Sequence, residues 1–432
     1  MKPPLTLLLA ALVAVPVICP AAIKQRAHNY LEEAETALRN HDPDAALRGL
    51  DALLKDSPRH APAHFWRGRV LADKGELDKA LADFDEAIRL EPGYADAYAY
   101  RGYVQEKRRE PDAALADLNR ALRLDPMHEF GLLCRGLLLG DRGETRAALG
   151  DLDAVIGMNP GHGLALASRA RVHLLRRDWP AALADFDRCL AMNPKDALAT
   201  SGRGSAHFFK GELRAAVEDF TRTIELLPQS AAPLAQRGHA WLGLQEKDKA
   251  LADFAAALLI DPKNAAALLG RAEVRRIGKD WPAALLDYDA ALAQAPDDFA
   301  ALLGRASVHY GSGALDQAVA AYADIVKRFP DEPQPCNDWA WLLATSTKDA
   351  LRNGARAVEL AAQACALTAW QNAAYLDTFA AACAEKGDFA EALKWQREAV
   401  RLATPETAEV QAELQSRIAL YEQKKAYREE LK

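Results

Sequence analysis

Arginine and aspartate recur along the chain at a fixed spacing, and they are the residues best placed to do chemistry. Arginine stands at eight positions that are 34 residues apart: Arg67, Arg101, Arg135, Arg169, Arg203, Arg237, Arg271 and Arg305. Aspartate stands at seven positions with the same spacing: Asp83, Asp117, Asp151, Asp185, Asp219, Asp253 and Asp287. Because guanidinium and carboxylate groups form bidentate hydrogen bonds, the two series predict a ladder of partly buried, structural ion pairs that sets register.

The spacing leaves two points about this ladder open. Arg67 could pair with Asp83 in its own unit, or Asp83 could pair with Arg101 in the next unit. An alternative role for the arginine row is to bind the carboxylates of a ligand.

Other reactive residue types form no recognisable site. His60 and His64 are four residues apart, but a proline lies between them and no third ligand is near in sequence. The chain has no nucleophile motif, no glycine-rich phosphate loop and no zinc spacing of Cys and His. We therefore expect no catalytic residues, no metal and no cofactor. Cysteines beyond the N-terminal segment are expected to be buried thiols, and a bridge between Cys365 and Cys383 is the one pairing left open.

The 34-residue spacing also governs the positions of proline and of small residues. Prolines stand at 58, 92, 126, 160, 194, 228, 262, 296 and 330, which divides residues 27–332 into nine contiguous units. Counting from Ala61 as position 1, position 8 of every unit is Ala or Gly, position 20 is Ala, and position 24 is Phe, Tyr or Leu. This pattern predicts two antiparallel helices per unit, packed closely at the small residues, with the proline ending the second helix.

The repeated pattern resembles the tetratricopeptide repeat (TPR), over about residues 27–406. The resemblance implies an all-α fold: a right-handed superhelical solenoid of antiparallel helical hairpins whose first helices line a concave groove. After residue 332 the pattern continues as a TPR-like unit with a five-residue insertion at 333–372 and a TPR unit at 373–406. This pair resembles a terminal module of bacterial TPR proteins. Residues 407–432 are predicted to form one amphipathic capping helix.

The N-terminal segment is of a different kind. Residues 5–18 are apolar and uncharged, and Lys2 precedes them. This length suits a secretory signal peptide at 1–22 and is short for a membrane-spanning helix. We expect export to the periplasm or the cell exterior, with retention as an anchor in the cytoplasmic membrane as the alternative. The net charge of −7 gives no reason to expect nucleic acid as a partner, and a membrane partner is expected only if the segment is retained.

The candidate binding surface is the face of the first helices at repeat positions 2, 5, 9, 12 and 13. In the middle of the array this face is largely apolar, which indicates a surface for a partner segment or packing against neighbouring helices. The candidates are Phe130, Leu133, Leu137, Arg171, Leu174, Phe208, Phe209, His239 and Leu242. The predicted function is a non-catalytic protein-interaction scaffold of the bacterial cell envelope. The alternatives are a regulatory or recruiting subunit of a separately encoded enzyme and a membrane-anchored assembly factor.

Overall fold

The computed structural model describes residues 32, 36–37, 42–403 and 408–430, and the predicted signal segment 1–22 lies outside them. The described residues form α-helices, one short 3-10 helix and no β-strand, which confirms the all-α repeat array. The chain divides into two compact units, Met1–Phe209 and Lys210–Lys432. Each is considered by itself below.

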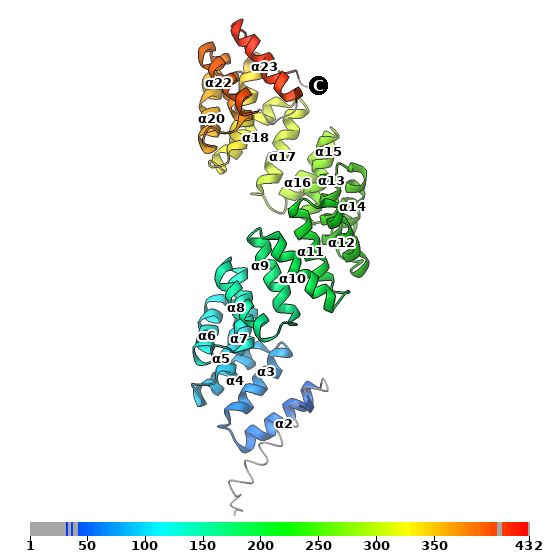
Figure 1. Ribbon diagram of the computed structural model, residues 1–432, viewed down its shortest axis with the longest axis vertical. Coiled ribbons are helices and arrows are strands. Elements are labelled where there is room, and N and C mark those ends of the chain that lie inside the picture. The colour runs from blue at the N-terminus through cyan, green and yellow to red at the C-terminus, as the bar shows by residue number, and fades with distance from the viewer. Residues whose placement is uncertain (1–31, 33–35, 38–41, 404–407, 431–432) are drawn as a thin grey trace, which may run out of the picture. The chain divides into compact units, whose positions relative to one another are not determined.

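Unit 1 consists of helices that alternate as first and second members of hairpins (Figure 1). Their bounds are α2 Pro43–Asp56, α3 Ala61–Asp73, α4 Leu77–Leu90, α5 Ala95–Lys107, α6 Pro111–Leu124, α7 Glu129–Asp141, α8 Thr145–Met158, α9 Gly163–Leu175, α10 Trp179–Met192 and α11 Ala197–Lys210, whose last residue lies past the boundary.

Unit 2 continues in the same way and ends in less regular elements (Figure 1). Its helices are α12 Leu213–Leu226, α13 Ala231–Gly243, α14 Lys247–Ile260, α15 Ala265–Ile277, α16 Trp281–Leu292, α17 Phe299–Gly311, α18 Leu315–Arg328, α19 Pro333–Thr345, α20 Gly354–Leu367, α21 Ala373–Lys386, α22 Phe389–Leu402 and α23 Ala408–Glu422. A 3-10 turn, η1 Asp349–Leu351, lies between α19 and α20.

Polar residues of the repeat begin the helices. The last residue of several units caps the following first helix: His60 Nδ1 accepts from the Ala63 amide at 3.1 Å, and Asn264 and Asp298 do the same by side-chain oxygens. The acid between the two helices caps the second helix where it is Asp42, but Glu76 forms no such bond. Aspartate is among the preferred N-cap residues because its short side chain folds back onto the helix amides.

Small residues let the two helices of a hairpin, and neighbouring hairpins, approach closely. A Cβ atom at Gly238 would lie 2.7 Å from the Phe254 ring of the same hairpin, and one at Gly270 would lie 2.3 Å from that ring. Phe254 is therefore held between glycines of two successive units. Its side chain is fully buried, as is Ala250 at the small position of α14. This interlocking of large and small side chains is the source of close packing in the array.

The C-terminal segment departs from the predicted single capping helix over 407–432. Helix α23 ends at Glu422 because Lys424 adopts a positive φ of 55° and the Lys425 amide donates to the Leu420 carbonyl at 3.0 Å. This bond pattern is a Schellman-type helix end. Residues 425–430, called the tail below, are not helical. The tail returns to the first helices of the preceding repeats, where the Glu429 amide donates to the Thr345 carbonyl at 3.0 Å.

Five cysteines within the described residues are free and buried, so the structure contains no bridge between Cys365 and Cys383. Cys365 Sγ instead donates to the Tyr375 carbonyl at 3.4 Å. Burial raises the pKa of both thiols to about 12, which keeps them protonated and unreactive. Among the described helices, none is both long and apolar enough to cross a bilayer.

Candidate functional site

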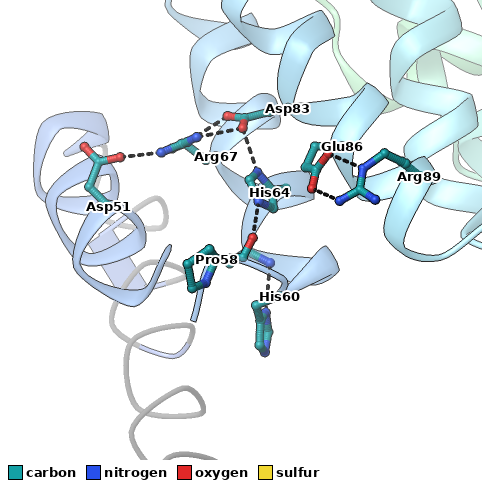
Figure 2. A network of polar contacts seen from close by, with 9 residues as sticks. Asp51, Pro58, His60, His64, Arg67, Asp83, Glu86 and Arg89 are labelled. Carbon is teal, nitrogen blue, oxygen red and sulfur yellow. Dashed lines mark hydrogen bonds and ion pairs between the residues drawn. The ribbon is translucent and has the colours of Figure 1, made fainter. Parts of the chain in front are cut away.

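The arginine and aspartate series meet inside single hairpins. Arg67 on α3 donates from Nε and Nη2 to the two carboxylate oxygens of Asp83 on α4, both at 2.8 Å (Figure 2). Asp83 is only 5% exposed. The hydrogen bonds to Asp83 raise the pKa of Arg67, so the guanidinium is permanently charged.

The same bidentate geometry recurs at 2.7–2.9 Å in both units. In unit 1 it joins Arg101 to Asp117, Arg135 to Asp151 and Arg169 to Asp185; in unit 2 it joins Arg237 to Asp253 and Arg271 to Asp287. The arginine and the aspartate of each of these pairs come from the same repeat.

The remaining guanidinium nitrogen, Nη1, reaches back to the preceding repeat. Arg67 Nη1 lies 2.8 Å from Asp51 on α2, as Figure 2 shows, and Arg101 and Arg169 contact Asp85 and Asp153 at 2.6 Å. The corresponding partners elsewhere are Asn119, Asp187, Thr221 and Asp289. This second polar series, at repeat position 25, was missed in the sequence although it has the same 34-residue spacing. At Arg67, Arg101 and Arg169, chain groups occupy both edges of the guanidinium, which favours the structural role over ligand binding at these positions.

The histidines near the start of the array are engaged within the chain. His64 Nδ1 lies 2.9 Å from Asp83 Oδ1, and its Nε2 lies 3.0 Å from the Pro58 carbonyl (Figure 2). His60 caps α3, and burial lowers its pKa. No group of three His, Cys, Asp or Glu side chains in the described part of the chain has an arrangement that could hold a metal ion.

The apolar candidates in unit 1 fall into two groups. Leu133 on α7 is buried, and Phe130 on the same helix stacks on Tyr100 with ring centroids 4.2 Å apart, so both take part in packing between repeats. Leu137 and Leu174 are half-buried and pack against the core of unit 1. Phe208 is half-buried and contacts Phe209, which is 60% exposed and stacks on Trp179.

Four large apolar side chains on α9 and α11 are more than half exposed, and we call them the apolar strip. They are Leu164 (54%), Leu175 (64%), Leu198 (81%) and Phe209 (60%). They occupy repeat positions 2 and 13 of two successive first helices. Residues 11 apart lie on the same side of an α-helix after about three turns, so each helix presents both of its residues on one side. Arg171 on α9 is exposed and pairs with Asp141 at 2.9 Å.

The two binding candidates in unit 2, His239 and Leu242, are in contact with other parts of the same unit. His239 Nε2 lies 3.2 Å from the Ala266 carbonyl at the start of α15, and its ring meets the Phe254 ring edge to face. Burial lowers the pKa of His239, which favours the neutral imidazole. Leu242 packs against the hydrophobic core of unit 2.

A cavity of about 650 Å³ in unit 2 was not predicted from the sequence. We call it the C-terminal cavity. First-helix residues of four successive repeats line it, among them Arg276, Tyr310, Asp338 and Asp377, and Arg417 of α23 and Glu429 of the tail complete the wall. In the sequence, the cavity is indicated only by aromatic and acidic side chains at first-helix positions of the last repeats. The residues of α23 and the tail that complete its wall do not follow the repeat pattern.

The repeat geometry can now be compared with known families. The tetratricopeptide repeat model matches residues 31–95, 71–128, 135–188, 176–231, 235–298 and 278–333. The chain belongs to the tetratricopeptide repeat family. Together these matches cover residues 31–128, 135–231 and 235–333, which is more than half of the chain.

Several solved structures are similar to the chain, and their sequence identity to it is low. A tetratricopeptide repeat protein from Parabacteroides merdae is 21% identical, with a TM-score of 0.43, over 58% of this chain and 99% of that one. The Cut9–Hcn1 hetero-tetramer of the APC/C is 16% identical, with a TM-score of 0.49, over 92% and 90%. PilF of Pseudomonas aeruginosa is 18% identical, with a TM-score of 0.44, over 49% and 97%. A comparison with curated protein sequences found no significant match.

Proposed function

We propose that this TPR protein is a non-catalytic interaction scaffold that holds an apolar segment of a partner protein on the apolar strip of α9 and α11. The exposure of four large side chains at equivalent positions of successive repeats carries the proposal. Exposed apolar side chains that recur at equivalent positions of successive repeats offer apolar surface to a protein partner.

The strip has the chemistry of an interface. Its apolar side chains supply the area that is removed from water on binding, which is the main favourable term in association. The exposed pair of Arg171 and Asp141 lies on α9 and α7 and supplies polar groups of the kind found at an interface rim. Hydrolytic, redox or metal chemistry would need a constellation of groups that the strip does not offer.

The site of action that we propose is the bacterial cell envelope. The apolar residues 5–18 behind Lys2 support export, with removal of a signal peptide at 1–22. N-terminal sequencing of the protein recovered from periplasmic and membrane fractions tests this step. A mature chain that starts after residue 22 is the expected result, and a chain that keeps Leu5 in the membrane fraction would show the anchored form instead.

Affinity capture tests the binding role. It compares the mature chain with one double variant and one single variant. Leu198→Asp/Phe209→Asp places charge in the strip, whereas Leu259→Asp places it on another exposed leucine, 85% exposed on α14. We expect the strip variant to lose partners that the parent and the Leu259→Asp control both retain. If a folded strip variant keeps every partner, the strip is not the binding surface. Recovery of an enzyme as the stable partner would identify a recruiting or regulatory subunit.

A further inference from the structure

The C-terminal cavity has the volume of a binding site. Its volume of about 650 Å³ falls within the roughly 300–1,000 Å³ that is typical of ligand pockets. Its lining residues come from the first helices α15, α17, α19 and α21, from the second helices α16 and α18, and from α23 and the tail. Every residue of its lining belongs to unit 2.

Aromatic side chains form much of the lining. Tyr310, Trp341 and Tyr427 face the cavity together with Trp281 and Tyr322. The chain itself places a cation against this wall: the Arg417 guanidinium carbon lies 5.5 Å from the Trp341 ring centre and 5.1 Å from that of Tyr427. Aromatic faces attract cations through their quadrupole, most strongly where water is excluded.

The charges that line the cavity do not balance. Both of its arginines are already paired, Arg276 with Glu273 at 2.7 Å and Arg417 with Asp377 at 2.8 Å. Asp338, Glu413 and Glu429 also line it, and within the described residues no lysine or arginine pairs with any of the three.

Two of these three carboxylates, Glu429 and Asp338, accept hydrogen bonds from neutral groups. Glu429 accepts hydrogen bonds from the neutral Trp341 Nε1, at 2.5 Å, and from the Tyr310 hydroxyl. Asp338 is half-buried, and its hydrogen-bond donor Asn337 Nδ2 lies 3.2 Å away. The Asn337 Oδ1 atom is buried and has no partner among the described residues, so it is available to accept from an N–H group.

We infer that the C-terminal cavity binds a lysine or arginine side chain of an extended segment of another protein. The unbalanced carboxylates supply the charge, the aromatic wall supplies the faces for a cation, and Asn337 supplies a further acceptor. The tail shows that extended backbone fits beside this surface, since the Glu429 amide bonds to the Thr345 carbonyl and Arg428 pairs with Glu385 at 2.6 Å. This site goes beyond the proposed function, because it lies in unit 2 and uses none of the residues of the apolar strip.

Binding of blocked peptides to the full chain tests the inference. The probes are fluorescein-labelled glycine–serine dodecapeptides that carry three lysines, three arginines or three glutamates. We expect the lysine or the arginine peptide to raise the fluorescence anisotropy saturably and the glutamate peptide to have no effect. Saturable binding of the glutamate peptide, or of none of the three, would overturn the inference.

Three single variants assign the binding to the cavity. Asp338→Asn removes the half-buried charge and is expected to weaken the affinity by about tenfold or more, since a desolvated charge contributes strongly to binding. Glu413→Gln lies on the exposed side of α23, where folding is not at risk, and is expected to weaken it by about two- to threefold. Asp316→Asn, an exposed acid on α18 outside the cavity, is the control and should leave the affinity unchanged.

If all three variants bind the basic peptides with the affinity of the parent chain, the peptides bind only through the net negative charge of the protein. The proposed site would then be rejected. The strip variant Leu198→Asp/Phe209→Asp should bind the basic peptides as the parent does. The two proposals therefore fail independently.

Discussion

Arg169 joins two repeats through a single guanidinium. Its Nε and Nη2 atoms donate to the two carboxylate oxygens of Asp185 at 2.7 Å, and its Nη1 donates to Asp153 of the preceding repeat at 2.6 Å. The two carboxylates differ in burial, since the side chain of Asp185 is 4% exposed and that of Asp153 is 58% exposed. Because of this difference in burial, we expect the two ion pairs to contribute unequally to stability although their distances are similar.

Removing these two carboxylates separately should show that difference. Asp185→Ala leaves a partly buried guanidinium without its main partner and should lower the free energy of unfolding by about 3–5 kcal/mol. Asp153→Ala removes an exposed partner and should cost at most about 1 kcal/mol. Urea unfolding followed by circular dichroism measures both. A cost near zero for Asp185→Ala would contradict the view that the ladder is buried.

Glycine at position 6 of some repeats should be required by the aromatic ring of the preceding repeat. A Cβ atom at Gly270 would lie 2.3 Å from Phe254 Cζ, so Gly270→Ala should overpack the contact and cost roughly 1–3 kcal/mol. Gly150 on α8 is the matched control because a Cβ atom there meets nothing within 4 Å. Gly150→Ala should stabilise the chain by up to about 1 kcal/mol, as alanine favours helix. Equal melting temperatures of the two variants would refute the packing argument.

The stability of the chain should depend on pH through Asp338. Burial raises the pKa of this carboxyl to about 6. A carboxyl whose pKa is higher in the folded than in the unfolded state stabilises the fold when protonated, and that contribution is lost as the pH rises through 6. Asp338→Asn should therefore stabilise the chain at about pH 8, by at most about 3 kcal/mol, and give no gain at about pH 4. A stability difference that is independent of pH would contradict this assignment.

Two tyrosine hydroxyls in unit 2 should respond differently to removal. Tyr421 is fully buried and its hydroxyl has no hydrogen-bond partner in the part of the chain described, so Tyr421→Phe should be neutral or stabilising. Tyr310 donates to Glu429, so Tyr310→Phe should cost about 1 kcal/mol. Thermal unfolding of the two variants under the same conditions makes the comparison. Destabilisation by Tyr421→Phe would indicate that its hydroxyl has a partner.

The repeat pattern predicted those features that depend on contacts within one or two units. Small residues such as Ala250 and large ones such as Phe254 recur because each hairpin packs in the same way, so a single sequence reveals them. The partner at position 25 carries the same signal, but its residue type changes from Asp153 to Thr221. A search for a charge that recurs at the same position of each repeat therefore misses this partner, although both residues bond to an arginine.

The features that the sequence did not predict depend on contacts outside the repeat. The amphipathic pattern of 407–432 indicated one continuous helix, but α23 ends at Glu422 and the tail returns to the first helices of the preceding repeats. Burial of candidates such as Leu133 and His239 likewise depends on how closely successive helices approach, which the residue types alone do not determine.

The hydrogen bonds of the tail also bear on the order of folding. The ladder bonds connect residues 16 apart in sequence, whereas the bonds from Tyr310 and Trp341 to Glu429 span 119 and 88 residues. Contacts between distant residues form late, because the loop that they close costs more entropy than a local one. Docking of the tail requires α17, α19 and α23 to be in place, so the C-terminal cavity is completed only after the repeats around it have folded. A chain that binds a ligand at the C-terminal cavity would then be one in which the last folding step, docking of the tail, is complete.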